Sequence, residues 1–132
     1  MNYNELVEHY FFQPEHVGQL DSNQARVFHS RTGSASQGDY FDLYLCCDED
    51  GVILQACFKA YGNPYLIAGV EWACRQLVGK HIDEHSGIDY NLLIQLFDIP
   101  RSYYPVALLV EKGYSDVVKK LKDGMADMSK KR

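Results

Sequence analysis

The feature that most constrains the fold is a pair of apolar segments, residues 40–47 and 52–61, separated by the sequence Asp-Glu-Asp-Gly. Acidic residues followed by glycine between two apolar runs are typical of a β-hairpin turn, so we predict two antiparallel strands. A register that sets Cys47 opposite Val52 collects the apolar side chains on one face, which favours that register. The other expected pairs are Leu45 with Leu54, Leu43 with Ala56, and Phe41 with Phe58.

Helical periodicity marks most of the remaining chain. The expected helices cover residues 3–11, 64–78, 89–97 and 105–122. Pro14 ends the first helix, because the residue before a proline is disfavoured in helical geometry. Asn63 is suited to cap the second helix, Pro64 to occupy its first position and Gly79 to end it.

Together with a short strand over residues 25–30, these elements predict an α+β fold, in which a small antiparallel three-stranded sheet packs against helices on one face. The length of 132 residues suits one domain with one core. We expect this domain to cover residues 1–124. Residues 125–132, which end in three basic residues, are expected to form a frayed C-terminal tail.

The charge is unevenly distributed, with −8 over residues 1–112 and +3 over residues 113–132. An acidic body argues against nucleic acid as a partner. No apolar run approaches the roughly 20 residues that a membrane helix needs. The polar N-terminal residues also lack the order of a signal peptide. We therefore expect a cytoplasmic protein with neither a nucleic-acid nor a membrane partner.

The chain has four cysteines, which are Cys46, Cys47, Cys57 and Cys74. They form no C-x-x-C pair, and no histidine stands at zinc-finger spacing from them. In the predicted hairpin, Cys46 and Cys57 lie on the outer face, whereas Cys47 and Cys74 are expected to point to the core. We expect reduced thiols that pack as small apolar side chains.

Six short motifs follow one another along the chain at nearly gap-free spacing. They are His9-Tyr10 with Pro14 and Val17-Gly18, the loop from Gly33 to Gly38-Asp39, Asp50-Gly51-Val52-Ile53, Phe58-Lys59-Ala60-Tyr61-Gly62, Gly79-Lys80 with Asp83-Glu84, and Ile99-Pro100. Their order resembles that of the iron–sulfur cluster assembly scaffolds of the IscU type, which are also found as the N-terminal domain of NifU. The resemblance covers nearly the whole chain and implies the IscU/NifU N-terminal fold, which is SufE-like.

In that family, three cysteines and one aspartate hold a 2Fe–2S cluster, or zinc in the resting form. Carried over residue by residue, the resemblance places the first cysteine at Gln37, the aspartate at Asp39, the second cysteine at Asn63, and the third at Val106, which follows a histidine position at Pro105. Iron–sulfur clusters are held by thiolates, and neutral amides are poor ligands for iron or zinc. Asp39 is therefore the one retained candidate metal ligand.

Asp39 has a second interpretation, which we favour, as a loop aspartate that accepts hydrogen bonds from nearby backbone N–H groups. Asn63 is likewise better explained as a helix cap than as a ligand. We treat the five histidines as structural or exposed.

The expected function is that of a non-enzymatic pseudo-scaffold, an interaction or regulatory module of the cluster-assembly machinery that binds no cofactor by itself. The alternative is a working scaffold with non-standard or partner-supplied ligands. A third hypothesis is a small-molecule or hydrolytic site that reuses Asp39. The sequence does not support it, because it shows no nucleophile–base pair and no phosphate-binding loop.

The resemblance implies a cysteine desulfurase or other assembly proteins as partners of a monomer or weak homodimer. The chaperone-binding segment of the family survives only in Ile99-Pro100, so we do not expect that partnership. We expect an interface at Ile99, Pro100, Tyr103 and Tyr104. Further apolar side chains expected near the former metal pocket are Tyr61, Tyr65, Leu92 and Leu96. The alternative to an interface is that these aromatic and leucine side chains pack in the ordinary way within the fold.

Overall fold

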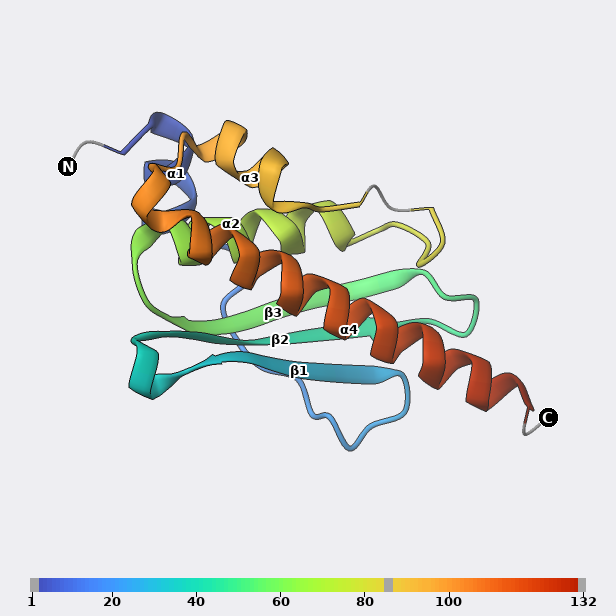
Figure 1. Cartoon of the computed structure of the whole chain (residues 1–132). Coiled ribbons are helices and arrows are strands. Elements are labelled where there is room, and N and C mark those ends of the chain that lie inside the picture. Colours follow the sequence, from blue (N-terminus) through green and yellow to red (C-terminus); the bar gives the residue numbers. More distant parts are fainter. Residues whose placement is uncertain (1–2, 85–86, 131–132) are drawn as a thin grey trace.

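The computed structural model describes residues 3–84 and 87–130 as a three-stranded sheet with helices on one face (Figure 1). The strands are β1 (Val27–Ser34), β2 (Asp39–Cys47) and β3 (Ile53–Tyr61), antiparallel in the order β1-β2-β3. The helices are α1 (Glu5–Phe12), α2 (Pro64–Leu77), α3 (Tyr90–Phe97) and α4 (Tyr104–Lys130), with short 3₁₀ turns η1 (Ala35–Gln37) and η2 (Arg101–Tyr103). The predicted α+β class and sheet are confirmed.

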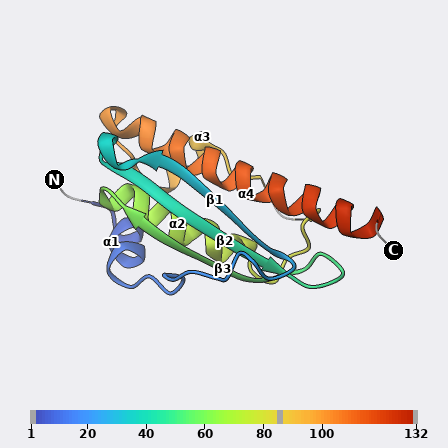
Figure 2. The ribbon, with the colours of Figure 1, turned by 90° about the horizontal axis from the view of Figure 1, so that it is seen from below.

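Helices α2 and α4 cover one face of the sheet and bury the core against it, α2 over β3 and α4 over β1 and β2. None of the helices that the structure describes lies over the other face, as the view in Figure 2 shows. Alternation along β2 places Phe41, Leu43 and Leu45 on the covered face, each at most 1% exposed. Within the described residues, no helix is both long enough and apolar enough to cross a bilayer.

The hairpin forms as predicted, but its register is shifted by two residues. Leu45 pairs with Ala56, not with Leu54, because the connection is one residue longer than expected and a bulge lies between Cys46 and Cys47. A shift of two residues preserves the faces of most side chains. The bulge, however, turns Leu54 outward, where it is 53% exposed, and buries Ile53 in its place.

Three of the predicted helices begin and end within two residues of their expected bounds, and their caps explain why. The Asn4 side chain accepts the Val7 N–H and opens α1. The Asn63 side chain accepts the Tyr65 and Leu66 N–H groups and opens α2, as predicted. Asp89 caps α3 in the same way.

Two elements are longer than predicted. β1 extends to Ser34, because it pairs with β2 along its whole length. α4 was expected to end at residue 122 and to be followed by a frayed tail, but it continues as a helix to Lys130. Its last turns still touch the sheet, since Met125 Sδ lies 3.5 Å from Cys47 Sγ.

Two glycines let α4 approach the sheet closely. A Cβ at Gly113 would collide with the ring of Phe41, and one at Gly124 with the ring of Phe28. The backbone of α4 therefore passes directly over these rings. This close seating fixes how α4 lies on β1 and β2.

Candidate functional site

One end of the sheet gathers the four positions that the motifs predicted as ligand positions. Here β2 begins, β3 ends, and both α2 and α4 start, at the left of Figure 1. Gln37, Asp39 and Val106 line one cavity of about 320 Å³, together with Pro105 and Leu109. Asn63 lies beside this group, with its backbone nitrogen 3.2 Å from Asp39 Oδ1.

Asp39 opens β2 on the same face as Phe41, so its side chain lies on the side of the sheet that the helices cover. Its Oδ1 atom accepts the backbone N–H of Asn63 and, at 3.4 Å, the Asn63 side-chain amide. The backbone bond agrees with the interpretation of Asp39 as a hydrogen-bonded aspartate. Gly62 makes room for the carboxylate, because a Cβ there would collide with Asp39 Oδ1.

The other three positions offer no soft ligand. Asn63 uses its side-chain oxygen to cap α2, with bonds of 2.9 and 3.2 Å to Tyr65 N and Leu66 N. Val106 is apolar and only 6% exposed, and Gln37 is an exposed neutral amide. Thiolates are what iron–sulfur clusters require. The residues that line the cavity therefore do not fit a cluster or a closed zinc site.

The cysteines lie elsewhere, as predicted. Cys47 and Cys74 are buried in the core, and Cys46 and Cys57 are half-buried on the sheet. Burial raises the pKa of the thiols of Cys47, Cys57 and Cys74, so the protonated form is favoured. Over residues 3–84 and 87–130, no three His, Cys, Asp or Glu side chains come together as a metal site.

The expected interface residues do not form one exposed surface. Ile99 is 5% exposed and belongs to the core, so its assignment to an interface is wrong. Tyr65 is also buried, at 3% exposure, where it packs between Tyr3 and Tyr103. Tyr61 is 60% exposed but stacks on the ring of Tyr40. Pro100, Tyr103 and Tyr104 are half-buried, and Leu92 is 39% exposed.

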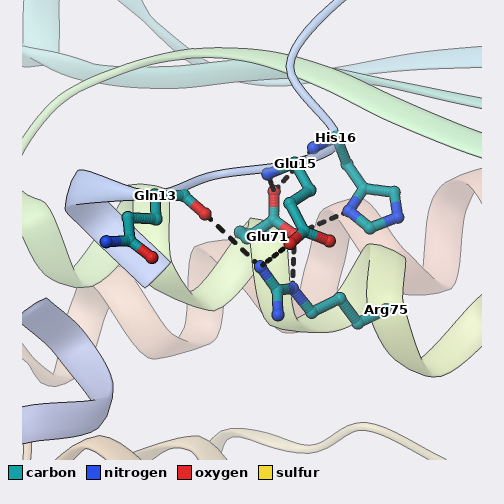
Figure 3. Close-up of polar contacts among 5 residues, drawn as sticks. All are labelled: Gln13, Glu15, His16, Glu71 and Arg75. Atoms are coloured by element: carbon teal, nitrogen blue, oxygen red, sulfur yellow. Dashed lines mark hydrogen bonds and ion pairs between the residues drawn. The ribbon is translucent and has the colours of Figure 1, made fainter. Parts of the chain in front are cut away.

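A second polar cluster lies on α2, away from the cavity (Figure 3). Glu71 is fully buried, and its Oε1 accepts the backbone N–H groups of Glu15 and His16 at 2.8 Å each. Its Oε2 atom lies 2.6 Å from His16 Nδ1 and 2.7 Å from Arg75 Nε. This one carboxylate fixes the segment after α1 to α2.

The pKa of Glu71 reflects two opposed effects. Burial raises it, but the hydrogen bonds from Arg75 and His16 prevail, and the pKa lies below its ordinary value. On the uncovered face, Asp42 is in a similar position. A two-pronged bond from Arg31 and a contact with His29 lower its pKa, although burial opposes them.

Sequence reasoning missed Leu109 as a cavity residue and Glu71 as a buried charge. The signal for Leu109 was available, since it lies three positions after Val106 on one helical face. Glu71 gave no such signal, because its partners at residues 15 and 16 are more than 50 positions away.

The model of a known family, described as the NifU-like N terminal domain, matches residues 2–125. The chain belongs to this family. The iron-sulfur cluster assembly protein IscU of Plasmodium falciparum is 32% identical over 122 residues, which are 92% of this chain and 75% of the relative. The scaffold protein IscU of Escherichia coli K12 is 27% identical over 132 residues, which are all of this chain and 98% of the relative.

Solved structures agree with this fold. A putative iron-sulfur cluster assembly scaffold protein for the SUF system from Fervidobacterium islandicum superposes with a TM-score of 0.69 at 21% identity, covering 88% of this chain and 96% of the other. The N-terminal part of a NifU-like protein from Brucella abortus gives 0.66 at 17% identity, covering 91% and 94%. Both share the predicted architecture of a three-stranded sheet with helices.

Proposed function

We propose that this member of the scaffold family holds no iron–sulfur cluster with its own side chains and serves cluster assembly as a non-catalytic interaction or regulatory module. The observation that carries the proposal is the donor set at the four family positions. It consists of one carboxylate, an exposed amide, an amide already used as a helix cap, and a buried valine. Such a set lacks the thiolates that a cluster requires.

The partners that we propose are those that membership of the family suggests. A cysteine desulfurase or another cluster-assembly protein would dock on the retained fold, in the cytoplasm, against a monomer or weak homodimer. Pro100, Tyr103 and Tyr104 remain our candidates for contact residues beside the start of α4, and Leu92 adds an exposed apolar side chain on α3.

Reconstitution tests the proposal. The purified chain is incubated with ferrous iron, cysteine and a cysteine desulfurase, and visible absorbance and bound iron are measured. We expect no chromophore and no stoichiometric iron or zinc. A stable iron–sulfur chromophore on the chain alone would overturn the proposal.

A matched variant makes the negative result informative. Gln37→Cys, Asn63→Cys and Val106→Cys together restore three thiols around Asp39, and this variant should bind about one zinc ion or assemble a cluster under the same conditions. If the variant binds metal and the natural chain does not, the deficit lies in the side chains and not in the fold.

A working scaffold that borrows ligands from a partner is the second candidate. It is favoured by the cavity of about 320 Å³ that remains beside Asp39. Reconstitution in the presence of an intact scaffold paralogue separates the two. A chromophore that needs both proteins, and is lost in Asp39→Asn, would favour the second candidate over the first.

A further inference from the structure

Within the part of the chain that the structure describes, Asp39 differs from the buried carboxylates Glu71 and Asp42 in having no basic partner. Glu71 pairs with Arg75 and His16, and Asp42 pairs with Arg31 and His29. Among residues 3–84 and 87–130, no lysine, arginine or histidine forms an ion pair with Asp39, and no donor reaches its Oδ2 atom. Half-buried carboxylates gain from a cation, so this oxygen can still accept one.

Three of the residues that line the cavity with Asp39 are apolar. Val106 and Leu109 project from one face of α4, and the ring of Pro105 lies at its first turn. The cavity of about 320 Å³ compares with roughly 30 Å³ for a water molecule in the liquid. It therefore accommodates a side chain of five non-hydrogen atoms. At the rim, the exposed amide of Gln37 offers a second acceptor.

We propose that this cavity receives the side chain of a lysine from a partner protein, with the ammonium group on Asp39 Oδ2 and the methylene stem against Val106 and Leu109. The inference rests on the proposed function and names the chemistry of the partner at the same site. A lysine side chain has an apolar stem, which matches the apolar residues that line the cavity, and a positively charged end, which matches the carboxylate of Asp39.

The geometry favours lysine over arginine and over a metal ion. An arginine fork binds best to both oxygens of a carboxylate, but Oδ1 of Asp39 is already bonded to Asn63. An ammonium group needs only one carboxylate oxygen and has two further donors for Gln37 and water. Among the residues that line the cavity, a divalent cation would find one carboxylate and no second charged ligand.

The surrounding charges are compatible with this occupant. Residues 1–112 carry a net charge of −8, which attracts a basic segment. Helix N-termini disfavour cations. At the start of α2, however, the N–H groups of Tyr65 and Leu66 already donate to the Asn63 side chain, and the N–H of Asn63 donates to Asp39. At the start of α4, Pro105 has no N–H.

The test uses blocked lysine, N-acetyl-lysine methylamide, titrated at millimolar concentrations into the ¹⁵N-labelled full chain and followed by NMR. We expect shift changes confined to the amides of Gln37, Asp39, Val106 and Leu109. The neutral analogue N-acetyl-norleucine methylamide, which keeps the apolar stem, should bind about tenfold more weakly or not at all. Asp39→Asn should lose the difference between the two probes.

Asp123→Asn provides the matched control, because it removes one exposed carboxylate from α4 far from the cavity. It should bind both probes as the natural chain does. Equal binding of lysine and norleucine, an unchanged preference in Asp39→Asn, or shifts spread over the surface would each overturn the inference. These outcomes are independent of metal content, so the inference can fail while the reconstitution result stands, and the reverse.

Discussion

Glu71, within α2, and Asp39, beside the start of α2, show two ways in which this chain places a carboxylate. Glu71 is fully buried and receives two backbone N–H groups, an imidazole and a guanidinium. Asp39 is half-buried and, within the part of the chain that the structure describes, receives hydrogen bonds from Asn63 alone. A buried charge is tolerated when its acceptors are satisfied. The first carboxylate thus serves the fold, whereas we propose that the second keeps one oxygen for a ligand.

The largest expected effect is on stability at the first carboxylate. Glu71→Ala leaves two backbone N–H groups and the charge of Arg75 without their acceptor, so we expect the free energy of unfolding to fall by about 3 kcal/mol. Urea unfolding followed by circular dichroism measures this. Glu49→Gln, in the exposed hairpin turn, is the control and should change stability by less than about 0.5 kcal/mol. An equal loss in both variants would contradict a particular contribution of the Glu71 contacts to stability.

The pH dependence of folding should report the same cluster. The pKa of Glu71, and also that of Asp42, lies below the ordinary values of about 4.5 and 3.8. As the pH falls, these carboxylates are therefore protonated in the unfolded chain before they are protonated in the folded chain. Their contribution to the free energy of unfolding is complete above the ordinary pKa values and is lost as the pH falls through the lower folded pKa.

Each such group adds up to about 1.4 kcal/mol per pH unit to the slope of stability against pH in that window. The free energy of unfolding, measured from pH 5 downward, should fall more steeply with decreasing pH for the natural chain than for Glu71→Gln. Parallel slopes would contradict the assignment of a lowered pKa to Glu71.

A smaller effect is expected from the residue that links the cavity to α2. Asn63→Ala removes the cap of α2 and should cost about 1 kcal/mol. Asn63→Asp or Asn63→Ser retains a capping oxygen and should recover most of this stability. If all three variants unfold alike, the cap is not what Asn63 contributes.

The smallest effect is expected at Asp39 itself. Asp39→Asn keeps an oxygen for the Asn63 N–H, so its free energy of unfolding should stay within about 0.5 kcal/mol of the natural value. Thermal and urea unfolding check this. A loss comparable to that of Glu71→Ala would remove the contrast between the two carboxylates and assign Asp39 to the fold.

Much of the fold could be predicted because local patterns carry it. Apolar alternation located β2 and β3, and capping residues located α2. The register could not be predicted, because the bulge after Cys46 leaves no trace in an alternating pattern. The end of α4 was missed because its last turns are polar, and the contact of Met125 with Cys47 is tertiary.

The candidate site, like the fold, could be predicted only in part. The order of the motifs predicted that Gln37, Asp39 and Val106 belong to one site, and all three line the same cavity. No periodicity in the sequence relates β2 to the start of α4. Burial was harder to predict, since Ile99 and Tyr65 looked available in the sequence and are enclosed by their neighbours. Contacts between segments far apart in the chain decide exposure, and the sequence alone does not display them.

The close seating of α4 on the sheet has a consequence for the cavity. Because a Cβ at Gly113 would collide with the ring of Phe41, a larger side chain there must displace the helix or the ring. Val106 and Leu109 are carried by the same rigid rod, one to two turns earlier. The place of these two cavity residues beside Asp39 therefore depends on the absence of a side chain at Gly113, on a part of α4 that does not line the cavity.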